Sequence, residues 1–214
     1  MIAIIKGDIV SSRKMDNPEV WLLPLKELFD KWGETPVQWE LVWGDSFQLE
    51  VDQPAEALLK ALSIKALIKK TMPKNKNKKA SDIDVRMAIG LGEKNYSGKR
   101  ISESNGEAFI NAGEKFEELE REKVNLLIKS PWRDFDDEMN LYLRLISIFM
   151  DNWTIASAEL MEMVLKYPDR KQNEIGKMLD IKQNSVSGRW KRARIDEILA
   201  VEQVYRRKLN KLMI

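Results

Sequence analysis

The 214-residue sequence contains no cysteine and no histidine. Without cysteine the chain has no disulfide, no thiolate metal ligand and no cysteine nucleophile, which suits a reducing cytosol. Without histidine, any acid–base group must be Asp, Glu, Lys or Tyr. Any metal site must be rich in oxygen, which favours Mg²⁺ or Mn²⁺ over Zn²⁺. We therefore expect a cytoplasmic protein that binds hard cations if it binds metal at all.

Long apolar runs are also missing. Leu145–Met150 is among the longest and has six residues, whereas a membrane-spanning helix needs about 20. The opening Met1–Ile5 is apolar, but no basic region precedes it and no cleavage site of small residues follows it. These residues predict a first strand rather than a signal peptide, and we expect no membrane partner.

The formal net charge of +2 hides an uneven distribution. Residues 1–128 contain 20 Lys and Arg against 21 Asp and Glu, whereas residues 170–214 contain 12 against 5. Residues 182–194 carry five basic side chains and no acidic one. A nearly neutral chain with one basic end predicts a local contact with a polyanion.

Strands and helices alternate in residues 1–130, and only helices follow in residues 131–214. Asn17-Pro18 is a typical helix start, and Ser104 with Glu107 predicts a capping box. Two alternating runs, Val37–Trp43 and Phe47–Val51, flank Gly44-Asp45-Ser46 and predict a β-hairpin. The lysine-rich segment 73–81 predicts a surface loop. The order contains βαββαβ, so we expect an α+β protein with a ferredoxin-like domain at residues 1–130 and an all-α domain at residues 131–214.

Residues 172–194 have the pattern of a helix-turn-helix. Gly176 is small enough for two helices to approach closely, and Asp180 tolerates the left-handed conformation of the turn. The second helix presents basic and amide side chains of the kind that contact phosphates and base edges in a major groove. A plain helical hairpin with a solvated basic face is the alternative. The expected contacts with double-stranded DNA come from Lys182, Gln183, Asn184, Ser187, Arg189, Lys191, Arg192 and Arg194.

Two acidic residues stand at the ends of predicted strands. In a βαββαβ sheet the first and third strands are antiparallel neighbours, which brings Asp8 close to Asp45, about 4–6 Å apart if both bind one cation. With the backbone carbonyl of Ile9, they form a candidate Mg²⁺ or Mn²⁺ site facing a phosphate-bearing ligand such as a nucleotide. The alternative is ordinary turn chemistry with solvated carboxylates. Candidate phosphate-binding residues are Ser11, Ser12 and Arg13.

These segments resemble the class III nucleotide cyclases. The resemblance rests on Gly7-Asp8-Ile9-Val10, Gly44-Asp45, the strand Val85–Gly90 and the helix 106–112, and it implies a metal site at Asp8, Asp45 and Ile9. Cyclases stabilise the transition state with an asparagine and an arginine, which correspond to Ile110 and Glu114 here. The adenine-selecting lysine corresponds to Leu41. The metal pair is therefore shared and the rest of the catalytic set is not, so the catalytic residues remain unknown.

Over nearly its whole length the chain is similar to the SatD family of bacterial proteins. The shared segments are Gly-Asp-Ile-Val at residue 7, Gly-Asp-Ser-Phe-Gln at residue 44 and Gly-Glu-Ala-Phe at residue 106. The resemblance implies a cyclase-like domain followed by a helix-turn-helix domain, and hence a DNA-binding transcriptional regulator. The alternatives are a magnesium-dependent, nucleotide-transforming enzyme and a scaffold that binds no ligand.

We also expect a homodimer, because cyclase-like domains pair and helix-turn-helix proteins usually bind two half-sites. The last helix supports this expectation with an apolar stripe that needs a partner. That partner is either a second copy or the chain's own helix at Leu141–Phe149. The stripe consists of Ile198, Val201, Tyr205, Leu209 and Leu212.

Overall fold

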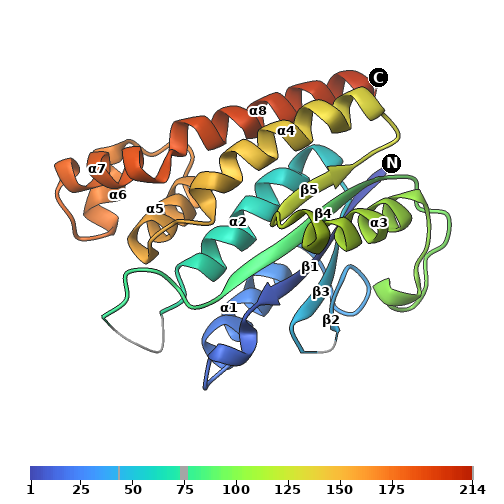
Figure 1. Ribbon diagram of the computed structural model, residues 1–214, viewed down its shortest axis with the longest axis horizontal. Helices are drawn as coiled ribbons and strands as arrows, with labels where there is room; N and C mark the ends of the chain where they lie inside the picture. Colours follow the sequence, from blue (N-terminus) through green and yellow to red (C-terminus); the bar gives the residue numbers. More distant parts are fainter. Residues whose placement is uncertain (43, 73–76, 214) are drawn as a thin grey trace.

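The computed structural model describes residues 1–42, 44–72 and 77–213 as a mixed α+β structure (Figure 1). Its strands are β1 (Ile2–Val10), β2 (Trp39–Val42), β3 (Ser46–Val51), β4 (Asp84–Gly92) and β5 (Leu126–Lys129). Its helices are α1 (Glu19–Asp30), α2 (Ala57–Lys69), α3 (Glu107–Glu122), α4 (Arg133–Met150), α5 (Ile155–Lys166), α6 (Gln172–Met178), α7 (Gln183–Ala193) and α8 (Ile195–Leu212), with short 3₁₀ turns at Ser12–Lys14, Pro54–Glu56 and Ile101–Glu103.

The five strands form one sheet in the order β2-β3-β1-β4-β5. β1 is antiparallel to both β3 and β4, and β5 pairs in parallel with β4. The prediction that the first strand lies antiparallel beside the third is therefore confirmed. β1 runs five residues past the apolar run that ends at Ile5, because pairing with β3 and β4 continues as far as Asp8 and Val10 respectively.

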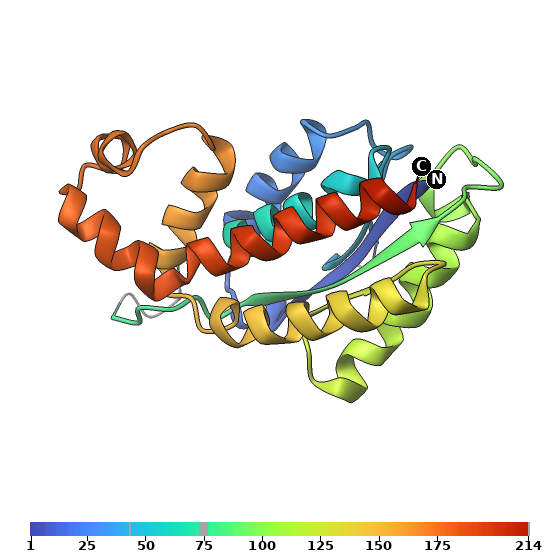
Figure 2. The same cartoon turned by 90° about the horizontal axis from the view of Figure 1, so that it is seen from above.

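Both faces of the sheet are covered by helices, and β1 shows how the sequence alternates between them. Ala3 and Ile5 belong to the large core shared with α1 and α2, whereas Ile4 packs against Ala108 and Ala112 of α3. Figure 2 shows α3 on one side of the sheet and α1 and α2 on the other. On the α3 side the approach is close enough to require Gly90. A Cβ at this position would lie 2.2 Å from the Ala108 carbonyl oxygen.

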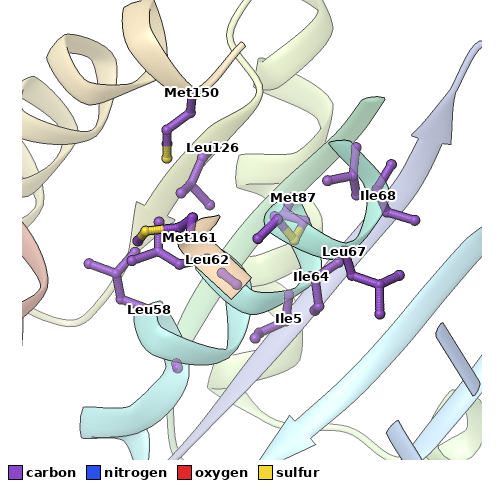
Figure 3. Close-up of a cluster of buried hydrophobic side chains, with 14 of the residues drawn as sticks. Ile5, Leu58, Leu62, Ile64, Leu67, Ile68, Met87, Leu126, Met150 and Met161 are labelled. Atoms are coloured by element: carbon purple, nitrogen blue, oxygen red, sulfur yellow. The ribbon is translucent and has the colours of Figure 1, made fainter. Parts of the chain in front are cut away.

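The C-terminal helices share this core rather than forming one of their own. Figure 3 shows side chains from β1, β4, β5 and α2 packed together with Met150 of α4 and Met161 of α5. At the far end, the Tyr205 hydroxyl of α8 donates to the Pro54 carbonyl at 2.7 Å. Complete burial raises the pKa of Tyr205 strongly, so this hydroxyl stays a donor. Residues 131–214 are thus packed along the α2 side of the sheet.

A buried ionic cluster fixes the junction between α4 and α5. Lys65 of α2 pairs with Asp84 of β4 at 2.6 Å and with Asp151 at 2.5 Å. Lys69, one helical turn further, pairs with Asp84 at 3.3 Å and donates to the Asp151 carbonyl at 2.7 Å. The Lys65 and Lys69 side chains are 3% and 7% exposed. Such lysines are stable in a core only when their charges are paired.

One local prediction needs correction. The capping box at Ser104 is wrong. α3 begins at Glu107 with Gly106 as its N-cap, and the Ser104 hydroxyl instead accepts a hydrogen bond from the Gly98 amide. A backbone φ of 153° at Gly106 moves Ser104 away from the helix start. Trp43 of the predicted hairpin and residues 73–76 of the predicted loop lie outside the described residues.

The apolar stripe of α8 finds its partner within the chain. Ile198, Tyr205 and Leu209 are buried, and α8 packs against α4 and α2. The α8 stripe therefore gives no support to a dimer. Among the described helices, none is both long and apolar enough to cross a membrane.

Candidate nucleic-acid interface and the sheet edge

The turn between α6 and α7 has the geometry that the sequence predicts. Asp180 adopts a left-handed φ of 51°, and the Ile181 amide donates back to the Gly176 carbonyl at 2.9 Å. A Cβ on Gly176 would lie 2.9 Å from the Ile181 oxygen and 3.2 Å from the Val186 side chain. A larger residue would therefore push the two helices apart. Ile175 and Val186 are buried beneath the turn.

α7 turns one face inward and leaves the other open. Val186 and Ala193 are fully buried, and α7 packs against both α5 and α6. Five of the residues proposed to contact DNA lie on the exposed face, and within the described part of the chain no hydrogen bond or ion pair occupies their side chains. These are Lys182, Gln183, Asn184, Lys191 and Arg192. Ser187 is half-buried at the border of this face.

The other two arginines of the predicted interface have partners inside the chain. Arg189 pairs with Glu159 of α5 at 3.0 Å, and its side chain is only 21% exposed. Arg194 ends α7 in a left-handed conformation, lies 5.4 Å from the centre of the Phe149 ring and pairs with Glu197 at 3.2 Å. Arg189 therefore holds α7 to α5, and Arg194 links α7 to the end of α4.

Gly188 lies at the centre of the outer face of α7 and was not among the DNA-contact residues expected from the sequence. A glycine within a helix costs about 0.5–1 kcal/mol relative to alanine. No packing requires it here, since the nearest atom to an added Cβ is the exposed Arg192 guanidinium at 3.3 Å. The absence of a side chain allows another backbone to approach this face closely. The sequence does mark this residue, because it is a glycine in the middle of the predicted second helix, away from the turn.

At the sheet edge, Asp8 is held by an arginine. Arg86, its antiparallel neighbour on β4, donates from Nε to Oδ1 at 3.0 Å and from Nη2 to Oδ2 at 2.7 Å. The hydrogen bond to Asp8 raises the pKa of Arg86 above its ordinary value. A second acid, Glu120 of α3, lies 3.7 Å from Arg86. Both carboxylate oxygens of Asp8 are therefore engaged in a bidentate ion pair.

Asp45 lies beside Asp8 in the backbone but has different partners. The Ile9 amide donates to the Asp45 carbonyl at 2.9 Å, and Asp8 is paired in register with Ser46. The Asp45 carboxylate accepts from the Ser12 hydroxyl at 2.8 Å. Sequence reasoning correctly placed the two strand ends together, but the side chains are occupied within the chain.

These contacts do not fit a divalent-cation site. Asp8 would have to release Arg86, and no group of three or more acidic residues in the described ranges is placed to hold a metal ion. The three expected phosphate-binding residues differ in their surroundings. Ser12 is used by Asp45, Ser11 adopts a left-handed φ of 62°, and Arg13 is exposed. We therefore derive no chemistry through a metal here.

A cavity of about 480 Å³ lies between α1, α2 and α5, where no site was expected from the sequence. Its wall is apolar at Leu28, Leu59 and Leu165, and the ammonium of Lys60 lies 5.0 Å from the centre of the Trp32 ring. Burial lowers the pKa of Lys60, which Glu56 partly opposes. The volume of the cavity is within the range of small-molecule sites. Lys31, Lys70 and Lys166 also line it, as do Glu27 and Glu162.

Neither the family models, the curated proteins nor the solved structures include a match to this chain.

Proposed function

We propose that the protein is a DNA-binding transcriptional regulator in which α7 enters the major groove. The observation that carries the proposal is the outer face of α7. Its polar and basic side chains have no partners in the described chain, and residues 182–194 contain no acid to neutralise them. Buried contacts at Val186 and the tight turn at Gly176 hold this face outward.

The finer architecture that we infer has two parts. The strands β1 to β4 lie in the order β2-β3-β1-β4 with the connectivity βαββαβ, which supports a ferredoxin-like, cyclase-like unit extended by β5. The helices α5, α6 and α7 support a helix-turn-helix unit in which α7 is the recognition helix. This arrangement is consistent with the resemblance to the SatD family.

The α/β part has a binding or dimerisation role in this proposal rather than a catalytic one. Ile110 is 53% exposed and has no polar group, and Glu114 is paired with Lys129. Neither supplies the donor that a developing phosphate charge needs. Together with the Arg86 clamp on Asp8, this favours binding over turnover. The cavity between α1, α2 and α5 is the place we propose for a phosphate-bearing ligand. Lysines and glutamates both line it, and Lys70 pairs with Glu162 at 2.6 Å, so Lys31, Lys60 and Lys166 are the cations that would meet the phosphate.

Fluorescence anisotropy with a labelled random-sequence duplex tests the DNA contact. Affinity should fall steeply between about 50 and 200 mM salt, because binding releases counterions from the DNA. Lys191→Ala should weaken binding to all sequences and reduce the salt slope by about one. Arg121→Ala removes an exposed cation from α3, on the other side of the sheet, and should leave the slope unchanged.

Base recognition has a separate signature. Asn184→Ala should cost roughly 1–3 kcal/mol on the preferred site, with little change on random DNA. A selection from a randomised duplex pool supplies that site. If the wild-type protein shows no salt-sensitive affinity for any duplex near 50 mM salt, where non-specific contacts are strong, the DNA proposal is wrong.

A further inference from the structure

α4 has two apolar faces, and only one of them is used within the chain. The inner face is buried against the sheet and α8 and consists of Phe135, Met139, Leu143, Ile146 and Met150. The outer face carries four apolar side chains that remain in solvent. Leu141 is 55% exposed, Leu145 50%, Ile148 62% and Phe149 36%.

The four exposed residues form one continuous stripe. Their spacing of four, three and one residues places them on the same side of the helix, over about 12 Å of its length. A helix that already packs one face normally presents charged and polar side chains on the other. Contiguous exposed apolar side chains on a folded protein instead mark an interaction surface.

Charges at the two ends of the stripe have opposite signs. At the N-terminal end of α4, Asp134 and Asp137 are exposed, and the one ion pair of Asp137 among the described residues is a long 3.8 Å contact with the 92% exposed Arg133. At the C-terminal end, the Arg194 guanidinium covers Phe149 and pairs with Glu197 at 3.2 Å. The exposed Lys191 and Arg192 line the same hollow beside Phe149, so cations outnumber acids at this end. If two such helices are antiparallel, the acidic end of each lies beside the basic end of the other.

We propose that this stripe binds the same stripe of a second copy of the chain, as an antiparallel α4–α4 pair about a two-fold axis near Leu145. A two-fold contact uses one self-complementary patch, which an apolar centre with oppositely charged ends provides. The proposal deepens the dimerisation role proposed above and does not depend on DNA binding. α7 lies beyond the C-terminal end of α4 (Figures 1 and 2). The pairing therefore puts the two α7 helices at opposite ends of the dimer.

The absence of cysteine from the sequence makes a direct test possible. Leu145→Cys introduces a single thiol next to the proposed axis, where a disulfide requires Cα atoms about 4.4–6.8 Å apart. Under mild oxidation it should form a covalent dimer within minutes at micromolar protein. Ile110→Cys is the matched control, because Ile110 is a similarly exposed apolar residue on α3 (53%). It should form far less dimer under the same conditions.

Light scattering of the full chain gives the second measurement. The wild type should have the mass of a dimer at about 10 μM, in the affinity range of a modest protein interface. Leu145→Glu combined with Ile148→Glu should give a monomer with unchanged circular dichroism, whereas Ile110→Glu should remain dimeric. Charge reversal tests the antiparallel register. Asp137→Arg should weaken the dimer, and adding Arg194→Asp should restore it.

Two results would overturn the proposal. The first is a monomeric wild type at about 100 μM, a concentration at which even weak specific pairs associate. The second is a dimer that survives the double glutamate change and does not crosslink through Leu145→Cys. Failure of DNA binding would leave these measurements unaffected, so the two proposals fail independently.

Discussion

The sheet edge at Asp8 and the outer face of α7 both carry concentrated charge, but they differ in where the partners are. At the sheet edge Asp8 is matched by Arg86, and Asp45 by Ser12. On α7, Lys191 and Asn184 have no partner among the described residues. Charges satisfied inside the chain explain its stability, whereas unsatisfied donors are free to meet something from outside. Residue type alone does not separate these cases.

Asp84→Ala should have the largest effect, because it breaks the most enclosed charge cluster. Among the described residues, it leaves the buried Lys65 with the Asp151 carboxylate as its remaining acid, and the buried Lys69 with only the Asp151 backbone carbonyl. Removing one member of a buried ion pair costs about 3–5 kcal/mol. Urea unfolding followed by circular dichroism measures it. The control Asp137→Ala, in an exposed pair, should change the free energy of unfolding by less than about 0.5 kcal/mol. If both variants lost the same free energy of unfolding, the buried cluster would stabilise the fold no more than an exposed ion pair does.

Arg86→Ala should cost about 1–2 kcal/mol, less than the buried cluster because the Asp8 and Arg86 side chains are 19% and 26% exposed. Thermal unfolding with and without MgCl₂ then tests whether the sheet edge at Asp8 binds Mg²⁺. The wild type should show no magnesium-dependent rise in Tm. A rise that Asp8→Asn abolishes would instead establish the metal site expected from the sequence.

Gly188→Ala should raise stability by about 0.5–1 kcal/mol, because alanine is the better helix former and the added methyl meets only a flexible arginine. The same change should weaken DNA binding, since the methyl group stands where a DNA backbone would approach. Urea unfolding and anisotropy measure the two effects. Unchanged DNA affinity in the stabilised variant would mean that this part of α7 contacts nothing.

The smallest effect concerns Asp136, whose carboxylate accepts from the Ser130 hydroxyl and amide. Burial raises the pKa of Asp136 above its ordinary 3.8, although the Ser130 bonds partly oppose the shift. Because the folded state binds this proton more tightly, its contribution to stability falls as the pH rises from 3.8 through the folded-state pKa. Asp136→Asn should therefore gain stability relative to the wild type across this window. A constant difference from pH 3 to 7 would contradict the raised pKa.

Sequence reasoning succeeded where the constraint was local. Gly176 and Asp180 reveal their turn because few residues tolerate a close helix approach or a left-handed φ. The antiparallel pairing of β1 with β3 was predicted from the order of strands and helices along the chain.

It was less successful where a long-range side-chain contact decides the outcome. The partner of Asp8 lies 78 residues away, and nothing within residues 7–13 indicates it. The charge of Arg86 between the apolar Val85 and Met87 was the only clue. Lys65 and Lys69 were similarly inconspicuous, although a lysine pair one turn apart in an apolar helix suggests buried acids. The helix at Leu141–Phe149 was expected only as one of two alternative partners of the α8 stripe, and its exposed outer face was not predicted, because periodicity does not say which of two faces meets which neighbour.

The ionic cluster at Asp151 has a mechanical consequence. It clamps Asp151, the C-cap of α4, to α2, whose Lys65 and Lys69 also bind Asp84 of β4, so the helices that carry α7 begin from a fixed anchor rather than a flexible linker. In the proposed dimer, two such anchors joined through the α4–α4 pair would hold the two α7 helices at a fixed separation. The spacing between the two α7 helices would then be set by the sheet and α4, and DNA would have to bend or twist to match it.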